Sequence, residues 1–495
     1  MKKRAAKVSR RVFLEATGAA ALGTFTSGCA RSVQPAFAGT QAERRPNIIL
    51  AMADDQGWGE MAYNGHPDLH TPHFDAMAAS GVRFDRFYSA APVCSPTRGS
   101  VMTGRHPNRF GCFKWGYSLR PQEVSVGEAL KRAGYVTGHF GKWHLGSVLA
   151  GSPVNPGAAG FDEWFSAYNF FDNDAILSRE GVAVQTQGES SMVTVDAAIE
   201  FISKHAGGGQ PFLAVVWFGS PHRPHRALAE DLERYRGLDK KKAALFAEVT
   251  AMDRAFGKLR DELCALGVHE NTLLWYCSDN GGLPESGATG GREQKGSIYE
   301  GGLRVPALLE WPARRSRPAV VDTPCVTSDI MPTLLQITGA SIGDNRPLDG
   351  VSLAPALENP DWKRPRGIGF WDYPIKGIGT PSDEWMKELL AEQAAGQPVA
   401  DKSRLRLDAA EIGDRYKHVA FQGHAAWLEW PWKLHRIEPK EGGEPVFELY
   451  NLADDPREAD NLAANQPKRV AAMTKSLDRW HDSVLRSLNG KDYAR

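Results

Sequence analysis

The chain has 495 residues, of which 42% are hydrophobic, and its 59 Lys and Arg residues equal its 59 Asp and Glu residues in number. This length fits one large α/β domain with an appendage, or two to three ordinary domains. The low hydrophobicity and high net charge of disordered chains are both absent. A formal net charge of zero gives no reason to expect nucleic acid as a partner. Six cysteines are too few for a disulfide scaffold.

The first 38 residues have the composition of an export signal. They carry seven basic residues and one acid, and Arg10-Arg11 precedes a weakly apolar run over residues 16–25. Ala36-Phe37-Ala38 offers a cleavage site, so the segment is typical of twin-arginine export. We therefore expect export by the twin-arginine machinery and a periplasmic or secreted protein, with lipidation at Cys29 as the alternative. Later runs fall short of the roughly 18 to 20 apolar residues of a spanning helix, which predicts a mature chain without an integral membrane segment.

Short apolar runs and helical patterns alternate from residue 47 onwards, which predicts a mostly parallel sheet flanked by helices. Strands are predicted at residues 47–53, 82–90, 135–140, 212–218, 272–277 and 305–311. Helices are predicted at residues 72–81, 125–133, 193–205, 240–266 and 328–339. The fold class is therefore α/β.

The pattern changes near residue 372. Gly, Pro and charged residues interrupt it over 372–415, which predicts an insertion or linker between a main domain at 39–371 and a C-terminal subdomain at 416–495. In the last part, strand-like runs at 426–437 and 446–452 precede a helical run at 468–485. These elements predict a small α+β subdomain with a short antiparallel sheet.

Polar residues that could bind a ligand or take part in catalysis follow the predicted strands. In an open α/β sheet, ligands bind beyond the carboxyl ends of the strands, so these positions are the first to inspect. The residues found there are Asp54-Asp55, Gly141-Lys142-Trp143-His144, Ser220-Pro221-His222 and Asp279-Asn280. Three acids, an amide, two imidazoles and a lysine are thus expected at one edge of the sheet.

The acids and the amide suit a metal ion. Asp54, Asp55, Asp279 and Asn280 offer only oxygen ligands, which favour a hard cation such as Ca²⁺ or Mg²⁺ over Zn²⁺. Each pair alone is better explained as a cap of a following turn or helix. Two such pairs at strand ends of one sheet favour a cation, because their mutual repulsion would otherwise be costly.

A cysteine motif precedes another predicted helix. In Cys94-Ser95-Pro96-Thr97-Arg98, followed by Thr103-Gly104-Arg105, Cys94 is expected at a helix N-terminus, where negative charge is favoured. A buried, inert cysteine is the alternative. The motif by itself is only moderately specific.

Together these residues resemble the type I sulfatases of the alkaline-phosphatase-like superfamily. The resemblance rests on the order of Asp54-Asp55-Gln56-Gly57-Trp58, Cys94-Ser95-Pro96-Thr97-Arg98, Gly141-Lys142-Trp143-His144, His222-Arg223-Pro224, Asp279-Asn280-Gly281, Lys295 with Glu300-Gly301-Gly302, and the run from Glu448 to Glu458. It covers nearly all of the chain beyond residue 38. It implies an alkaline phosphatase/sulfatase-like fold, a catalytic domain at 39–371 and a sulfuric ester hydrolase.

The resemblance also implies roles for individual residues. Cys94 would be converted to formylglycine by a maturation enzyme, and its hydrated aldehyde would be the nucleophile. Calcium would be held by Asp54, Asp55, Asp279, Asn280 and residue 94 itself. Arg98 and Lys142 would stabilise the oxygens of formylglycine, with His144 as the base that regenerates the aldehyde. His222 and Lys295 would bind the ester and neutralise or protonate the leaving alkoxide.

The substrate expected from the resemblance is a sulfated small molecule or glycan, and a sulfated carbohydrate is the preferred interpretation. A phosphonate or phosphate-ester hydrolase with the same modified cysteine is the alternative enzyme, and an inactive protein that binds sulfated glycans is the non-enzyme alternative. Thr97 departs from the serine more common in the family. Asn169 is a candidate for a further sulfate contact, and His225 is either structural or on the substrate side.

Overall fold

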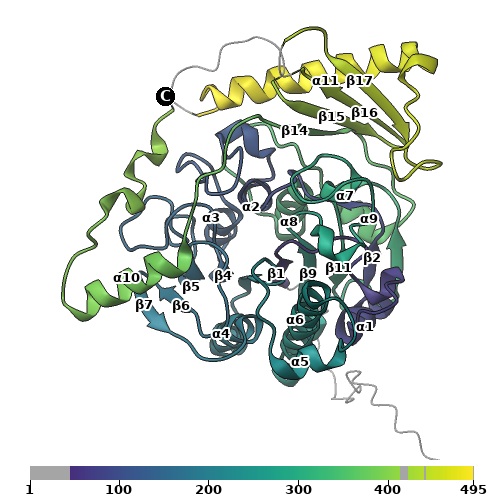
Figure 1. Ribbon diagram of the computed structural model, residues 1–495. Coiled ribbons are helices and arrows are strands. Elements are labelled where there is room, and N and C mark those ends of the chain that lie inside the picture. Colours follow the sequence, from purple (N-terminus) through teal and green to yellow (C-terminus); the bar gives the residue numbers. More distant parts are fainter. Residues whose placement is uncertain (1–44, 413–421, 440–441, 494–495) are drawn as a thin grey trace, which may run out of the picture. The chain divides into compact units, whose positions relative to one another are not determined.

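A ten-stranded mixed sheet forms the centre of the fold (Figure 1). In spatial order its strands are β12 (Ala319–Val321), β2 (Val82–Phe84), β11 (Ala307–Glu310), β9 (Thr272–Ser278), β1 (Asn47–Ala53), β8 (Phe212–Trp217), β4 (Val136–Lys142), β5 (Glu163–Ala167), β6 (Ile176–Arg179) and β7 (Val182–Gln185). The five strands from β9 to β5 are parallel to their neighbours, and antiparallel pairs lie towards both edges. The predicted α/β class with a parallel centre is confirmed.

The structure is a computed structural model, and it describes residues 45–412, 422–439 and 442–493, all within the unit that spans Gly39–Arg495. The predicted export segment 1–38, including Cys29, lies outside the described residues. Among the described helices, none has the length and apolar character that a membrane crossing requires.

Helices cover both faces of the central sheet because its middle strands are apolar on both sides. In β1, Ile48, Leu50 and Met52 belong to one buried core, and the alternate residues belong to the other. The first core also contains residues of α2 (Cys94–Thr103), α3 (Val126–Arg132) and α8 (Ile330–Thr338). The second contains residues of α1 (Pro72–Ser80), α4 (Ser190–His205) and α6 (Lys240–Ala265). Short helices α5 (Ala229–Arg234), α7 (Glu300–Leu303) and α9 (Ala354–Glu358) complete this part.

Two runs that the sequence presents as single strands each divide between two sheets. Residues 82–90 form β2 in the central sheet and β3 (Phe87–Tyr88) in a three-stranded sheet with β10 (Arg304–Val305) and β13 (Cys325–Val326). Residues 305–311 divide in the same way, because β10 pairs with β3 while β11 pairs with β2. The two runs therefore pass together from one sheet to the other.

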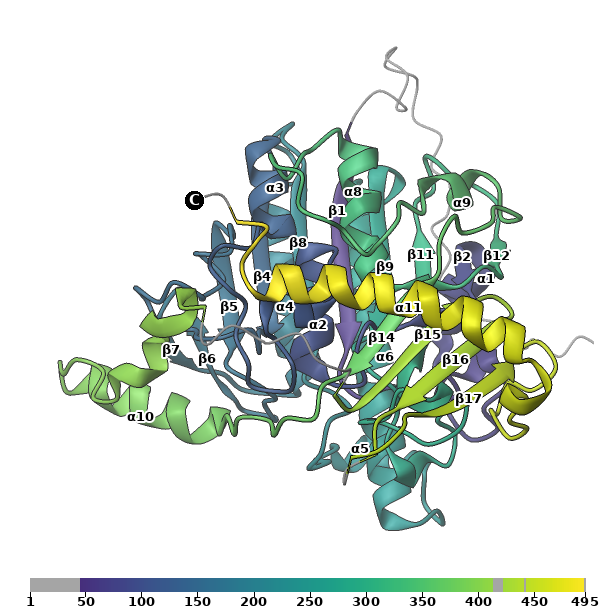
Figure 2. The same cartoon turned by 90° about the horizontal axis from the view of Figure 1, so that it is seen from above.

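A four-stranded antiparallel sheet lies near the C-terminus. Its order is β14 (Ile368–Asp372), β15 (His424–Glu429), β16 (Trp432–Ile437) and β17 (Val446–Asn451). The run predicted as one strand at 426–437 is instead a hairpin that turns at Trp430-Pro431. One face of this sheet packs on residues of β3 and α7, and the other packs on α11 (Pro467–Leu488). Figure 2 shows α11 crossing these strands.

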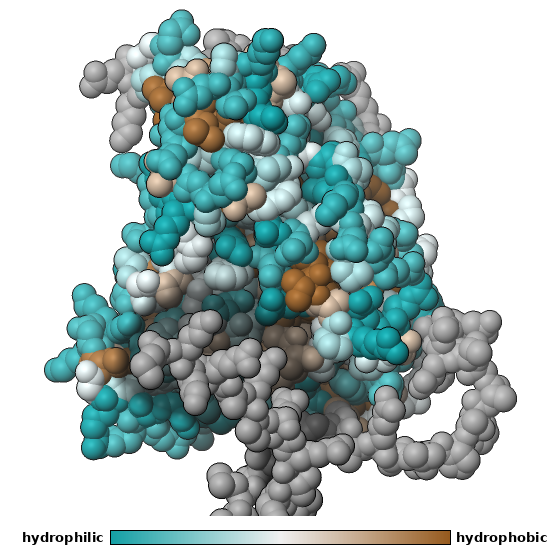
Figure 3. Space-filling model, turned by 90° about the vertical axis from the view of Figure 1, so that its right-hand side faces the viewer, coloured by the Kyte–Doolittle hydropathy of each residue, from teal (hydrophilic) through white to brown (hydrophobic). Residues whose placement is uncertain are grey.

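The segment between β14 and β15 contains α10 (Ser382–Ala394), which contacts β6 and β7 at one edge of the central sheet (Figure 1). The surface in Figure 3 is mostly hydrophilic where residues are described, and hydrophobic residues gather there in small separate patches. Apolar side chains are therefore concentrated in the interior cores.

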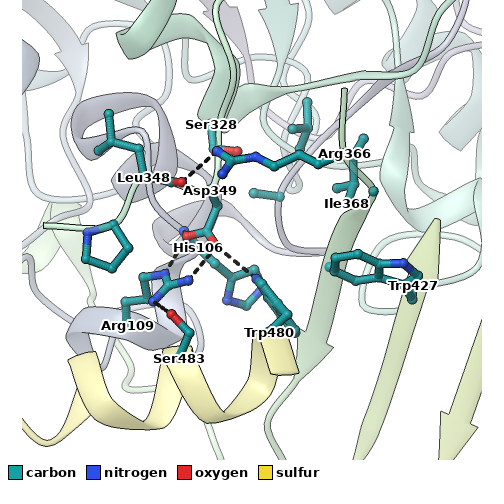
Figure 4. Close-up of a pocket in the computed structure, with 15 residues that line it drawn as sticks. His106, Arg109, Ser328, Leu348, Asp349, Arg366, Ile368, Trp427, Trp480 and Ser483 are labelled. Atoms are coloured by element: carbon teal, nitrogen blue, oxygen red, sulfur yellow. Dashed lines mark hydrogen bonds and ion pairs between the residues drawn. The ribbon is translucent and has the colours of Figure 1, made fainter. Parts of the chain in front are cut away.

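A partly buried carboxylate, that of Asp349, joins α11 to the segment that follows α2. Asp349 accepts hydrogen bonds from the His106 backbone N–H at 2.6 Å and from Arg109 Nε and Nη2 at 2.6 and 2.8 Å. Its Oδ1 also accepts from Trp480 Nε1 of α11 at 2.8 Å. Figure 4 shows this junction beside a cavity of about 210 Å³. The Asp349 carboxylate is thus one of several contacts that hold α11, because Arg109 also donates to Ser483 and Ser487 of that helix.

Candidate active site

The predicted site residues converge at one edge of the central sheet. Strands β9, β1, β8 and β4 are neighbours and run parallel, so their carboxyl ends lie together. Asp54-Asp55 follow β1, Asp279-Asn280 follow β9, and Lys142 is the last residue of β4. Except for Lys295 and His222, the side chains proposed for the site are buried.

The acids form one cluster with the cysteine. A carboxylate oxygen of Asp54, a carboxylate oxygen of Asp279 and Cys94 Sγ all lie within 4.8 Å of one another. Asp279 Oδ1 accepts a hydrogen bond from the Asp55 backbone N–H at 3.1 Å, and Asn280 Nδ2 donates to Asp55 Oδ1 at 2.9 Å. Asp55 has a φ of 69°, a left-handed conformation that Asp adopts more readily than most residues.

Three cations face these acids. Arg98 donates to Asp279 Oδ2 from Nε at 3.0 Å and from Nη2 at 2.7 Å. Lys142 Nζ lies 2.5 Å from Asp54 Oδ2, and Lys295 Nζ lies 2.5 Å from Asp55 Oδ1. Arg98 also donates to the Lys142 carbonyl at 3.1 Å. The formal charges of the three carboxylates and the three cations therefore cancel.

The acids differ in their electrostatic surroundings. Burial and the neighbouring charge of Asp54 raise the pKa of Asp279 to about 6, although Arg98 opposes the shift. Burial also opposes ionisation of Asp55, but Lys295 and His222 outweigh it and hold the pKa of Asp55 below its ordinary value. A second cation beside Asp279 would relieve this repulsion.

Two buried oxygens in the cluster lack hydrogen-bond partners among the described residues. They are Asp54 Oδ1 and Asn280 Oδ1. Buried polar atoms are normally hydrogen-bonded, and an unmet pair of oxygens next to two further carboxylates has the chemistry of a hard-cation site. The residues present thus fit a metal ion of the calcium or magnesium type.

Cys94 begins α2, so the predicted position at a helix N-terminus is confirmed, with the helix beginning three residues before Thr97. Its thiol is nevertheless no activated thiolate. Burial raises the pKa of Cys94, and Lys142 and Lys295 oppose the shift without reversing it. A thiol in this state is largely protonated near neutral pH and is a poor nucleophile.

The two histidines of the site are neutral for the same physical reason. Burial and the charges of Lys142 and Arg98 hold the pKa of His144 well below its ordinary value, and both ring nitrogens lack partners among the described residues. Burial lowers the pKa of His222 to about 3. His222 Nε2 lies 3.7 Å from Asp55 Oδ2, at the more exposed side of the cluster.

The structure also places residues that the motifs did not assign. Phe170 stacks on His222 with ring centroids 5.0 Å apart, a contact that no local pattern indicates. His225 lies between Glu248 and Glu285, 3.2 and 3.3 Å away, which is a structural position. The neighbouring Asn169 uses its Nδ2 to donate to the Thr380 carbonyl at 3.2 Å.

Comparison with known proteins identifies the family of the chain. A sequence model of the sulfatase family matches residues 46–340. The ulvan-active sulfatase of Formosa agariphila is 30% identical over 435 residues, which cover 75% of this chain and 83% of that protein. The human N-acetylgalactosamine-6-sulfatase is 33% identical over 361 residues, which cover 64% of this chain and 66% of the human protein.

The chain therefore belongs to the sulfatase family and is a sulfuric ester hydrolase. Its fold agrees with solved structures. Ps i-CgsB, crystallised with k-i-k-neocarrahexaose, superposes with a TM-score of 0.72 at 24% identity, over 90% of this chain and 98% of that chain. The phosphonate monoester hydrolase of Agrobacterium radiobacter superposes with a TM-score of 0.58 at 20% identity, over 89% and 96% of the two chains.

Proposed function

We propose that the chain hydrolyses sulfate monoesters on carbohydrate, with formylglycine made from Cys94 as the nucleophile and Ca²⁺ as the bound metal. The observation that carries the proposal is the cluster of Asp54, Asp279 and Cys94 within 4.8 Å at the carboxyl ends of parallel strands. Family membership supports the ester class. Similarity to the ulvan-active sulfatase of Formosa agariphila and to Ps i-CgsB, which was crystallised with k-i-k-neocarrahexaose, supports a carbohydrate substrate.

Asp54, Asp55, Asp279, Asn280 and residue 94 would hold the metal. The unpartnered oxygens of Asp54 and Asn280 support this assignment, and Ca²⁺ accepts such an all-oxygen set. When bound, the ion polarises the sulfate oxygens and makes the attacking oxygen more acidic. Because the site's own charges cancel, a divalent cation leaves a local positive charge that attracts an anionic ester.

Residue 94 would serve as the nucleophile only after Cys94 has been converted to formylglycine. Burial raises the pKa of the Cys94 thiol, which favours a nucleophile other than an unmodified thiolate. Formylglycine supplies a hydrated aldehyde, with one hydroxyl to attack sulfur and a second whose deprotonation later expels sulfate. Its conversion would need a maturation enzyme as a partner.

The surrounding side chains position the reaction. Arg98 is held on Asp279 and on the Lys142 carbonyl, so Arg98 and Lys142 can stabilise negative charge on the oxygens of residue 94. His144 is neutral, so one of its free ring nitrogens can accept a proton from a hydroxyl of residue 94. Lys295 and His222, at the more exposed side, would bind the ester and stabilise or protonate the leaving alkoxide.

The test is turnover of 4-nitrophenyl sulfate and a phenyl phosphonate monoester, measured in parallel on protein produced with a formylglycine-generating enzyme. We expect kcat/KM to be higher for the sulfate ester. A higher kcat/KM for the phosphonate would favour the alternative hydrolase instead. Absence of both activities in protein with modified residue 94 would contradict the proposal.

Export supplies a further part of the proposal. We place the mature protein in the periplasm or outside the cell, because Arg10-Arg11 and the segment around it are typical of the twin-arginine route. Without residues 1–38 the chain has 52 basic and 58 acidic residues, so attraction of an anionic ester must come from the local site. Replacing Arg10-Arg11 by Lys-Lys should retain the protein in the cytoplasm in cell fractionation, and unchanged export would contradict this route.

A further inference from the structure

A second cavity lies beside the active site. This cavity, here called the side pocket, has a volume of about 610 Å³. One wall comes from the main domain and includes Gly116, Gly146 and Tyr168. The other comes from the segment between β14 and β15 and includes Trp385 of α10 together with residues 402–404 and 406–408. The side pocket thus joins the predicted insertion to the main domain.

The wall of the side pocket contacts the proposed site through the backbone, because the His144 N–H donates to the Tyr168 carbonyl at 3.1 Å. Gly146 comes two residues after His144, and Tyr168 comes two residues before Phe170, whose ring stacks on His222. Gly116 donates its backbone N–H to Oγ of Ser95, the residue next to Cys94, at 2.9 Å. A ligand in the side pocket would therefore lie next to an ester bound at residue 94.

The lining is positively charged. Lys402, Arg404 and Arg406 face one acid, Asp408. The charge of Arg404 is neutralised by two carboxylates, because Arg404 forms ion pairs with Glu388 at 2.5 Å and with Asp401 at 3.3 Å.

Lys402 and Arg406 have fewer contacts with carboxylates than Arg404. In the part of the chain that the structure describes, Lys402 makes no ion pair. Arg406 forms an ion pair with Asp408 at 3.5 Å, and the side chain of Asp408 is 66% exposed. Exposed pairs of this kind contribute little, so both cations remain free to bind an anion.

The same cavity has an apolar side. The ring of Trp385 meets Tyr168 edge to face, with centroids 5.1 Å apart. Ile378 and Leu407 also line the cavity, although they are 40% and 65% exposed. Sugar rings present C–H faces that pack on such side chains, and their carboxylate or sulfate groups pair with Lys and Arg.

We propose that the side pocket binds an anionic sugar residue adjacent to the one that carries the sulfate ester, with Lys402 and Arg406 as its charge-recognising residues. This inference rests on the proposed carbohydrate substrate and assigns it a charge. The anionic group is a carboxylate or a second sulfate.

The test is binding to Cys94→Ala protein, which removes turnover from the readout. The probes are a sulfated disaccharide with a uronate, the methyl ester of that uronate, and a disaccharide with a second sulfate in place of the uronate. The variants are Lys402→Met with Arg406→Gln, and Lys387→Met as control, because Lys387 is an exposed cation of α10 that does not line the cavity. Calorimetry gives the Kd values.

We expect the double variant to weaken binding of at least one anionic disaccharide by about tenfold, as loss of a charge-assisted hydrogen bond would. The control should bind like the parent, and the methyl ester should bind weakly to every variant. Whichever anionic disaccharide loses affinity identifies carboxylate or sulfate as the group. Equal Kd values for the uronate and its methyl ester, with no effect of the double variant on the disulfated probe, would overturn the proposal.

A kinetic arm separates this inference from the proposed function. In protein with an intact residue 94, the double variant should lower kcat/KM for the anionic disaccharide about tenfold more than for 4-nitrophenyl sulfate, which has no second ring. Loss of the same size on both substrates would overturn the side pocket while leaving the sulfatase proposal intact. Inactivity of the parent towards 4-nitrophenyl sulfate would instead count against the proposed function.

Discussion

Substitution of Asp349 tests how much its contacts with Arg109 and α11 contribute to the free energy of unfolding. The perturbation is Asp349→Asn, which keeps the shape of the side chain and removes its charge. Arg109 is buried and donates two hydrogen bonds to this carboxylate, and Trp480 donates a third from α11 (Figure 4). The substitution therefore leaves a buried guanidinium without its anion, which in comparable buried pairs costs roughly 3–5 kcal/mol.

We expect Asp349→Asn to lower the free energy of unfolding by about 3 kcal/mol, because the amide oxygen still accepts some of these hydrogen bonds. Asp344→Asn is the matched control. Asp344 lies in the same loop and also pairs with an arginine, Arg346, but its side chain is 38% exposed, so its loss should cost at most about 1 kcal/mol. Urea unfolding followed by tryptophan fluorescence measures both values.

The same carboxylate predicts a pH dependence. Burial would raise the pKa of Asp349, but Arg109 outweighs it and holds the pKa well below the ordinary 3.8. The stabilisation is therefore complete above about pH 3.8 and is lost as the pH falls from there towards the folded-state pKa. The stability gap between parent and Asp349→Asn should narrow below about pH 4. A gap no larger than that of Asp344→Asn, or one independent of pH, would refute the reasoning.

Three further predictions concern the buried ion pairs of Lys433, the metal site and residue 94. Lys433 is buried between Glu300 and Glu458, 2.9 and 3.0 Å away, so Lys433→Met should cost roughly 3–5 kcal/mol in urea unfolding, and an unchanged midpoint would argue against the pair. Chelation of Ca²⁺, like Asp279→Ala, should weaken both turnover and sulfate binding; activity that survives metal removal would exclude the metal assignment. Cys94→Ala should abolish turnover and keep the native circular dichroism spectrum, whereas residual full activity would exclude residue 94 as the nucleophile.

The centre of the fold and the site could be predicted from sequence because both depend on local patterns. Strands such as β1 and β9 are apolar on both faces, which identifies them as central strands of a parallel sheet. The carboxyl ends of parallel strands meet at one edge of the sheet, so the sequence predicts that Asp54 and Asp279 lie close together, as they do in the structure. The family resemblance implies roles for Arg98 and Lys142 at residue 94 and for Lys295 at the ester, whereas their ion pairs with Asp279, Asp54 and Asp55 are known only from the structure.

Other features depend on contacts that a local pattern does not contain. Strands β5 to β7 are only four or five residues long, which is too short to show a clear apolar period in the sequence. The hairpin of β15 and β16 reads as one strand because apolar residues continue through Trp430-Pro431. Pairing of β14 with β15 joins segments that flank the whole predicted insertion. The side pocket arises from the same long-range packing.

The central claim is that residue 94 carries sulfate-ester hydrolysis only after it has lost its thiol. The most direct measurement compares preparations with different extents of conversion, produced with graded amounts of a formylglycine-generating enzyme. Peptide mass spectrometry gives the fraction of residue 94 that lacks sulfur, and 4-nitrophenyl sulfate gives the specific activity. We expect activity proportional to that fraction, with none at zero conversion. Full activity in protein whose Cys94 is entirely an unmodified thiol would contradict it.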